Sequence, residues 1–194
     1  MAWTIPRTII TIPDVLSAVE CSDHIARSEQ IGYEAAPVIT FRGPEINEEV
    51  RNNDRILVDD HELAAFIWPR VRDHIPTILD DREALGLNER FRYYRYKPGQ
   101  KFALHRDGSF RRENGEESKL TCILYLNNDF SGGETKVKDR VIEPQRGMAL
   151  IFRHEFLHEG RPVLAGKKYV LRTDVMYDRV GGSAAKMADR YRML

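Results

Sequence analysis

Two segments far apart in the chain contain the residues best suited to hold a metal ion. His105 and Asp107 lie in one segment, and His158 lies in the other. Two imidazoles and one carboxylate on one face form the triad that binds Fe(II) and leaves coordination positions open for oxygen and a co-substrate. The sequence therefore predicts a catalytic iron site at these three residues.

The positions of these residues on expected strands decide which way their side chains point. His105 and Asp107 are separated by one residue, and alternate side chains on a strand face the same side, so both can reach one ion. A lone H-x-D pattern recurs often by chance, so the prediction depends on the imidazole that His158 supplies from another strand. Lys168 and Arg172 follow on one face of the next expected strand. A cation there can bind a dicarboxylate co-substrate through charge-assisted hydrogen bonds.

The segment around His158 also contains a different metal signature. His154, Glu155 and His158 form a literal H-E-x-x-H, which in zinc hydrolases needs both histidines one turn apart on a helix, with the glutamate as general base. A strand-like run precedes this segment, and Gly160 and Pro162 follow it too closely for a stable helix. The context favours a polar role near the site for His154, and the zinc hydrolase stays as an alternative.

Helical patterns come first in the chain. Ser17 and Glu20 have the spacing of a capping box, which predicts a helix from this point to about Ile31. A second apolar-periodic stretch follows Asp59-Asp60, and Pro69 is expected to bend or restart that helix. Both predicted helices precede the metal-binding segments, so they are expected to support the site rather than to form it.

Short strand-like runs dominate from Arg90 onward, and Gly and Asn/Asp clusters separate them. The expected strands are residues 8–12, 56–58, 92–96, 120–126, 134–137, 149–152 and 169–177. Several short strands behind a helical lead-in predict a mainly β fold with supporting α structure, as in a jelly roll or a related double-sheet barrel. One domain over residues 1–194 is expected, with a helical support region at 1–89, a catalytic core at 90–178 and a tail at 179–194.

The bulk composition argues against several classes of protein. Lys and Arg number 30 and balance 30 Asp and Glu, so the sequence does not indicate a general nucleic-acid or membrane-surface binder. Cys21 and Cys122 form no C-x-x-C pair, so we expect two reduced, buried thiols. The sequence opens with no signal-peptide pattern, and no apolar run approaches about 20 residues, so we expect a soluble, cytoplasmic protein.

Five motifs follow one another in a fixed order between about residues 90 and 178. They are Tyr96-Lys-Pro-Gly-Gln-Lys-Phe-Ala-Leu-His-Arg-Asp107, Thr121-Cys-Ile-Leu-Tyr-Leu-Asn127, Ser131-Gly-Gly-Glu-Thr135, Pro144-Gln-Arg-Gly-Met-Ala-Leu150 and His158-Glu-Gly-Arg-Pro-Val, with Lys168 after them. In this order and spacing they resemble the catalytic domain of iron(II)- and 2-oxoglutarate-dependent dioxygenases of the prolyl 4-hydroxylase type. The resemblance implies a double-stranded β-helix (jelly roll) with the N-terminal helices packed on one sheet.

The resemblance also implies roles for individual residues. His105, Asp107 and His158 match the iron ligands, so these would be the catalytic residues. Lys168 matches the basic residue that binds the far carboxylate of 2-oxoglutarate, with Arg172 as a rival or helper. The residues that match the rest of the 2-oxoglutarate pocket are Tyr96, Tyr125 and Thr135. The implied cofactors are Fe(II), 2-oxoglutarate as co-substrate and O2, with ascorbate as a candidate reductant.

The resemblance implies hydroxylation of a C–H bond, with release of succinate and CO2. The substrate stays open between a peptidyl residue, with proline as one candidate, and an amino-acid-like small molecule. Arg51 and Arg55 flank a loop-like segment that suits recognition of a carboxylate or an amide, and a structural turn explains them equally well. A zinc hydrolase and a non-catalytic β-barrel binding module are the alternative functions.

Overall fold

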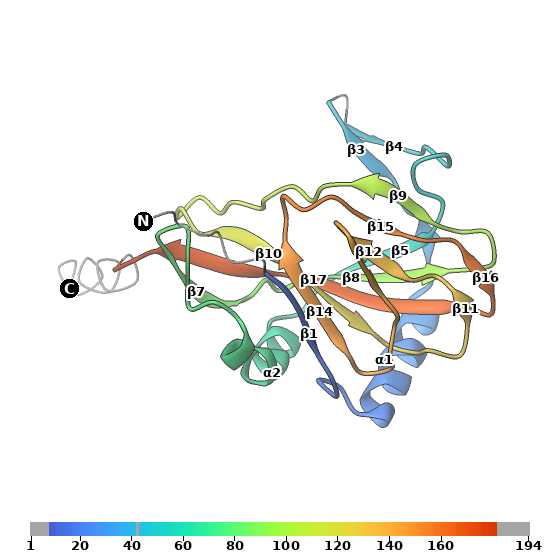
Figure 1. Cartoon of the computed structure of the whole chain (residues 1–194), viewed down its shortest axis with the longest axis horizontal. Helices are drawn as coiled ribbons and strands as arrows, with labels where there is room; N and C mark the ends of the chain where they lie inside the picture. Colours follow the sequence, from blue (N-terminus) through green and yellow to red (C-terminus); the bar gives the residue numbers. More distant parts are fainter. Residues whose placement is uncertain (1–7, 42, 182–194) are drawn as a thin grey trace.

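A computed structural model describes residues 8–41 and 43–181 of the chain (Figure 1). Helix α1 spans Ala18–Ile31, and its first turn contains the predicted capping box between Ser17 and Glu20. Helix α2 spans His61–Val71 and begins at the Asp60 cap, whose carboxylate accepts a hydrogen bond from the Leu63 amide. Pro69 lies inside α2, which ends two residues later and continues as the short 3₁₀ helix η1 (Arg72–His74). None of the helices in the described residues is long and apolar enough to span a membrane.

The larger sheet contains nine strands and forms the centre of the molecule. Its main path is β1 (Ile9–Ile12), β14 (Ala149–Arg153), β10 (Glu117–Tyr125), β17 (Lys168–Arg179), β8 (Arg90–Tyr96), β5 (Asp54–Asp59) and β2 (Glu34–Ala35). Strand β7 (Arg82–Leu87) pairs with β17, and β6 (Ile78–Leu79) pairs with β7. Strands far apart in the sequence are therefore neighbours, which brings the second half of the chain onto elements from the first half.

A second sheet of four strands lies over one face of the larger one (Figure 1). Its order is β13 (Arg140–Ile142), β12 (Thr135–Val137), β15 (His158–Gly160) and β9 (Phe102–His105). Two further pairs complete the described strands, β11 (Ser131–Gly132) with β16 (Val163–Ala165) and β3 (Val38–Thr40) with β4 (Gly43–Glu45). This is the double-sheet jelly roll that the sequence predicted.

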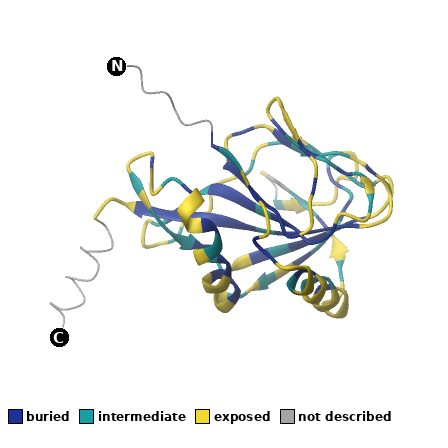
Figure 2. Cartoon of the chain, turned by 60° about the horizontal axis from the view of Figure 1, so that its bottom comes forward, coloured by how far each residue is buried: buried dark blue, intermediate teal, exposed yellow. Residues whose placement is uncertain are grey.

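The two faces of the larger sheet carry two separate hydrophobic cores, and the buried strands between them run through the middle of the molecule (Figure 2). Tyr93 and Leu171 face the helices and pack in one cluster with Ile67 of α2. Tyr94 and Val170, their neighbours in sequence, belong to the other cluster, between the sheets. Successive side chains of β8 and β17 therefore point to opposite faces of the sheet. The N-terminal helices pack on one face, as predicted, and the opposite face is left for the site.

The N-terminal region contributes more strand than its helical patterns predicted. Strands β1, β5 and β7 of this region pair with β14, β8 and β17 of the larger sheet. The short strands β2 and β4 consist of Glu-Ala and Gly-Pro-Glu, which contain no alternation to detect. The predicted tail beyond residue 181 lies outside the described residues. Both cysteines are free and buried, as predicted.

Gly147 fixes the approach of the N-terminal segment to the turn before β14. Its φ is 82°, and an added Cβ would lie 2.1 Å from the Leu16 carbonyl oxygen. The Leu16 amide donates to the Gly147 carbonyl at 3.1 Å, so the two backbones cannot separate without losing this bond. We expect Gly147→Ala to lower the free energy of unfolding in urea by about 2–4 kcal/mol.

Gly115 is the matched control for this substitution. It has a similar φ of 88° but nothing within 4 Å of an added Cβ, so Gly115→Ala incurs only the backbone penalty. Equal losses in the two variants would show that the contact with Leu16 has no separate effect on stability.

Candidate active site

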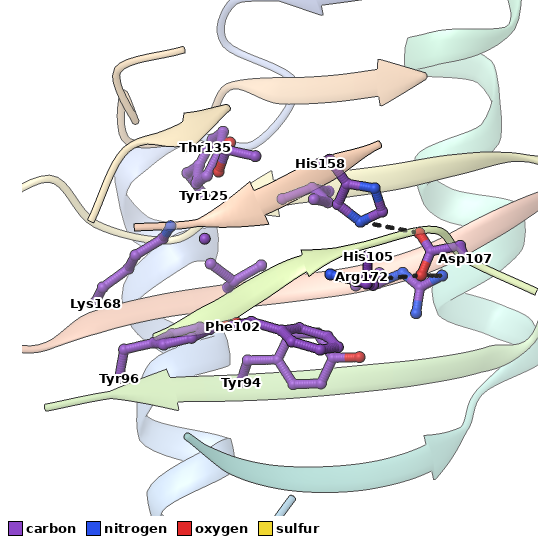
Figure 3. Close-up of a pocket in the computed structure, with 13 residues that line it drawn as sticks. Tyr94, Tyr96, Phe102, His105, Asp107, Tyr125, Thr135, His158, Lys168 and Arg172 are labelled. Carbon is purple, nitrogen blue, oxygen red and sulfur yellow. Dashed lines mark hydrogen bonds and ion pairs between the residues drawn. The ribbon is translucent and has the colours of Figure 1, made fainter. Parts of the chain in front are cut away.

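The three residues of the predicted triad meet at the edge of the second sheet (Figure 3). His105 ends β9, His158 begins β15, and the two are directly opposite in the antiparallel register. Asp107 follows β9 on the irregular segment, where its amide donates to the His154 carbonyl at 3.1 Å. One ligand atom from each of the three side chains lies within 4.8 Å of the others, which is close enough to share one ion.

Hydrogen bonds orient both imidazoles toward the carboxylate. The His105 Nδ1 lies 2.7 Å from the Ala103 carbonyl oxygen, and the His158 Nδ1 lies 2.9 Å from the Phe156 carbonyl oxygen. A carbonyl oxygen only accepts, so each Nδ1 carries the proton and each Nε2 keeps its lone pair. These Nε2 atoms lie 3.8 Å and 3.4 Å from the Asp107 carboxylate oxygens.

The local electrostatics keep the three groups in their ligating forms. Burial and the neighbouring His158 lower the pKa of His105 to about 4, against the opposing effect of Asp107. Burial also lowers the pKa of His158. Burial raises the pKa of Asp107, but Arg172, His158 and a hydrogen bond from Thr121 outweigh it and hold that pKa well below its usual range. At neutral pH the site thus presents two neutral imidazoles and one carboxylate, as metal binding requires.

A chain of hydrogen bonds holds the Asp107 carboxylate from behind. The Thr121 hydroxyl donates to Asp107 Oδ2 at 2.6 Å and accepts from His154 Nδ1 at 2.9 Å. The other ring nitrogen of His154 accepts from the Ser118 hydroxyl at 2.9 Å. The direction follows from Thr121, which has one proton and gives it to the carboxylate. His154 is therefore a buried polar residue near the site, as the sequence context favoured.

The H-E-x-x-H segment does not form the helix that a zinc hydrolase of this type needs. Residues 154–157 form a turn between β14 and β15, so His154 and His158 are not one helical turn apart. Both ring nitrogens of His154 already have partners, and the exposed Glu155 pairs with Arg153 at 2.7 Å. Gly160 and Pro162 leave no room for a helix, which is why the strand forms instead.

A pocket extends from the triad along the inner face of the larger sheet (Figure 3). Its lining consists of Tyr94, Tyr96, Phe102, His105, Asp107, Ile123, Tyr125, Thr135, His158, Gly160, Lys168, Val170 and Arg172. All eight predicted site residues are among them. The structure therefore brings these eight residues together from six strands and one loop.

Lys168 lies at the end of the pocket away from the triad (Figure 3). Its side chain is buried, and Nζ donates to the Gly133 carbonyl at 2.6 Å. Lys168 has no carboxylate within ion-pair distance in the part of the chain that the structure describes. Burial lowers its pKa to about 7, against the effect of Glu134. The Tyr125 hydroxyl beside it donates to Thr135 Oγ1 at 2.7 Å, and the Tyr96 ring lies 5.4 Å from Nζ.

Arg172, four residues further on the same face of β17, is already paired. Its Nη2 lies 3.0 Å from Asp107 Oδ1 and 3.1 Å from Asp174 Oδ1. This guanidinium therefore holds the triad carboxylate, while Lys168 is the pocket cation without an acidic partner among the described residues. The two basic residues that the sequence could not separate have different surroundings.

Sequence reasoning missed several parts of the site. Tyr94, Phe102, Ile123 and Val170 line the pocket, and Thr121 supports Asp107. Most of them could have been found because alternate residues of a strand face the same side. Tyr94 lies two residues before Tyr96 on β8, and Thr121 and Ile123 alternate with Tyr125 on β10. Phe102 instead stacks on His105 with ring centroids 3.6 Å apart, a contact that spacing alone does not predict.

The sequence of the chain is similar to those of known proteins. Residues 91–173 match the family model described as the 2OG-Fe(II) oxygenase superfamily. A PKHD-type hydroxylase of Paraburkholderia phymatum is 26% identical over 184 residues, which cover 82% of this chain and 74% of the relative. The family match and the relatives support a 2OG-Fe(II) oxygenase of the prolyl 4-hydroxylase type. The oxygenase is an oxidoreductase that uses Fe(II), 2-oxoglutarate and O2.

Solved structures share the fold of this oxygenase. A prolyl hydroxylase from Trichoplax adhaerens, in complex with a peptide fragment of hypoxia inducible factor, gives a TM-score of 0.67 at 17% identity, covering 93% of this chain and 87% of that one. The viral collagen prolyl hydroxylase of Paramecium Bursaria Chlorella virus-1, in its 2OG complex, gives 0.62 at 20% identity, covering 88% and 97%. Both likenesses establish the jelly roll independently of sequence identity.

Proposed function

We propose that His105, Asp107 and His158 hold the Fe(II) of this oxygenase and that Lys168 binds the far carboxylate of 2-oxoglutarate. The observation that carries the proposal is a triad of neutral imidazoles and carboxylate at one end of a pocket, with a buried lysine that has no acidic partner among the described residues at the other. The donor set of two nitrogens and one oxygen suits Fe(II) and leaves positions open for a chelating oxoacid and oxygen.

The other side chains of the pocket would bind the co-substrate, orient Asp107 and exclude water. Bound there, Fe(II) with 2-oxoglutarate and O2 supplies oxidative decarboxylation to succinate and CO2, together with hydroxylation of a C–H bond. Tyr125 and Thr135 offer hydroxyls beside Lys168 for the same carboxylate, and Tyr96 closes the pocket wall. Arg172 and Thr121 fix the two oxygens of Asp107. Val170 and Ile123 line the middle of the pocket with apolar surface, which excludes water from the reacting groups.

We propose a peptide as the substrate, with a prolyl residue as the site of hydroxylation. The support is the prolyl hydroxylase fold, including a neighbour described in complex with a peptide, and the relative described as a PKHD-type hydroxylase. Fold alone does not fix a substrate, so the peptide class needs its own test. Incubation with proline-containing peptides and mass spectrometry for a gain of one oxygen tests it, and oxidation of free amino acids alone would contradict it.

Titration of metal-free protein tests the cofactor site directly. Under anaerobic conditions Fe(II) and 2-oxoglutarate are added, and the visible charge-transfer band of a chelated oxoacid is followed. We expect the band in the wild type and not in His105→Ala or His158→Ala. No band, with tight zinc binding instead, would contradict the proposed site.

Thr121 offers a test of how Asp107 is held. We expect Thr121→Val to weaken Fe(II) binding by about 10–100-fold, because the carboxylate loses the donor that orients it and His154 loses its acceptor. Thr173→Val is the matched control, since it removes a buried hydroxyl that bonds the Asn88 carbonyl at 2.6 Å, away from the pocket. Metal titration and urea unfolding of both variants separate the two effects, and equal metal affinities would contradict a positioning role.

The depressed pKa of Lys168 predicts how 2-oxoglutarate binding depends on pH. At pH 8 the free lysine, with a pKa of about 7, is mostly neutral, whereas a bound carboxylate favours the ammonium form. Binding should therefore take up a proton, and affinity should fall as pH rises above 7. Calorimetry of the Fe(II) protein in phosphate and in Tris, whose ionisation enthalpies differ, measures the proton. No uptake at pH 8 would contradict Lys168 as the anchor.

A further inference from the structure

A row of arginines continues the pocket outward along the same face of the larger sheet. Arg55 on β5 is directly opposite Tyr94 on β8, and Arg92 on β8 is directly opposite Arg172 on β17. Residues directly opposite one another lie on one face of a sheet, and Tyr94 and Arg172 line the pocket. Arg55 and Arg92 therefore lie on the same face of the sheet as the pocket, next to the residues that line it. Arg51 joins them, and we call these four residues the arginine strip: Arg51, Arg55, Arg92 and Arg172.

Arg51 is the member that most needs a ligand. Its guanidinium lies between two rings of the pocket lining, 4.5 Å from the Tyr94 centroid and 4.4 Å from the Phe102 centroid. The residue is 5% exposed, Nε donates to the side-chain oxygen Oδ1 of Asn53 at 2.7 Å, and the buried Nη2 has no hydrogen-bond partner among the described residues. A buried arginine nitrogen without a partner is costly, and a bound oxyanion would satisfy it.

The acidic groups near the strip do not neutralise it. Asp174 pairs with Arg92 at 3.3 Å and with Arg172, which also holds Asp107, the proposed metal ligand. Arg51 and Arg55 form no ion pair within the described parts of the chain, although Glu34 of β2 is the cross-strand neighbour of Arg55.

The charges also act on Tyr94 inside the strip. Burial alone would raise the pKa of Tyr94, but Arg51, Arg172 and Arg92 lower it to about 8. Burial together with Arg51 and Arg92 lowers the pKa of Arg55. The positive charge is therefore concentrated where the pocket opens onto β5. Leu57, which lies on the same face of β5, is 48% exposed, so solvent and ligands can reach this surface.

We propose that the arginine strip binds the carboxylate of an acidic residue in the peptide substrate, next to the residue that is hydroxylated. The planar, two-pronged guanidinium matches the geometry of a carboxylate, and Arg51 and Arg55 are the members without an ion pair among the described residues. The strip is short, because Tyr96 is the next residue of β8 on this face after Tyr94, and Arg95 between them points to the other face, where it is bound to Asp54 and Glu29. This limited size suits one or two acidic side chains rather than a nucleic-acid backbone. The inference rests on the proposed peptide hydroxylase.

Peptide binding to the anaerobic enzyme with Fe(II) and 2-oxoglutarate tests the strip. The probes are acetyl-Glu-Glu-Pro-Glu-Glu-amide, its Gln counterpart with the same shape and no charge, and a counterpart with phosphoserine in place of Glu. Calorimetry gives each affinity in the wild type, in Arg55→Gln and Arg92→Gln, and in the control Arg140→Gln on the edge strand β13. Thermal unfolding checks that each variant is folded.

We expect the Glu peptide to bind the wild type at least about tenfold more tightly than the Gln peptide. Arg55→Gln and Arg92→Gln should each remove most of that preference, and Arg140→Gln should keep it. Equal binding of the two peptides, no binding of either, or a preference that survives both strip variants overturns the inference. Binding of the phosphoserine peptide without the Glu peptide overturns the carboxylate assignment.

Measurements on the same samples distinguish a failure of the arginine strip from a failure of the proposed function. If the wild type shows no charge-transfer band with Fe(II) and 2-oxoglutarate, the cofactor site itself is wrong. If the band forms while the peptides bind without regard to charge, only the arginine strip is wrong.

Discussion

Asp107→Ala is expected to weaken Fe(II) binding by more than about 100-fold and to reduce succinate formation to background, because it removes a ligand rather than a supporting contact. The carboxylate also separates Arg172 from the two imidazoles, so its loss leaves positive charge where the ion should bind. Metal titration, succinate release and far-UV circular dichroism of the same variant measure these effects. Retained turnover in a folded Asp107→Ala protein would reject the triad.

A matched pair of histidine variants separates iron oxygenase from zinc hydrolase chemistry. We expect His105→Ala to lose metal binding outright, whereas His154→Ala should lose only the support that reaches Asp107 through Thr121. A zinc hydrolase that used His154 and His158 would give the opposite result, because His105→Ala would still bind metal and His154→Ala would not. Zinc and Fe(II) titrations of both variants decide between them.

Lys168→Met is expected to raise the dissociation constant for 2-oxoglutarate by about 100-fold, while Fe(II) binding is kept. Lys168 is buried without a carboxylate partner among the described residues, so the co-substrate provides its counter-charge. Lys167→Met is the matched control, because Lys167 is the exposed neighbour on the same segment. Affinity is read from the charge-transfer band under anaerobic titration.

The same variant makes a second, opposite prediction for the ligand-free protein. Burial lowers the pKa of Lys168, which means that its charge is held at a cost to folding. Methionine of similar length removes that cost, so ligand-free Lys168→Met should unfold at a higher temperature than the wild type at pH 6. Wild-type affinity for 2-oxoglutarate in Lys168→Met, with affinity lost in Arg172→Met, would make Arg172 the anchor instead.

The sequence alone determined the chemistry and the fold class. Two imidazoles and a carboxylate specify a small set of metals, whatever the fold around them, and the order of motifs after residue 90 identified the family. The capping box at Ser17 and the alternation in β8, β10 and β17 depend on contacts within a few residues, so they could be found without tertiary structure. These local signals placed the helices and the longest strands.

Only the tertiary structure shows that the two basic residues of the pocket have different surroundings. Lys168 and Arg172 lie on the same face of one strand, but among the described residues only Arg172 lies within ion-pair distance of Asp107 and Asp174. The sequence left Arg51 and Arg55 open between recognition of a carboxylate or an amide and a structural turn, and strand pairing then placed Arg55 beside Tyr94. Such contacts join residues far apart in sequence, and the free energy of a buried charge depends on every group around it, so no local pattern could have assigned them.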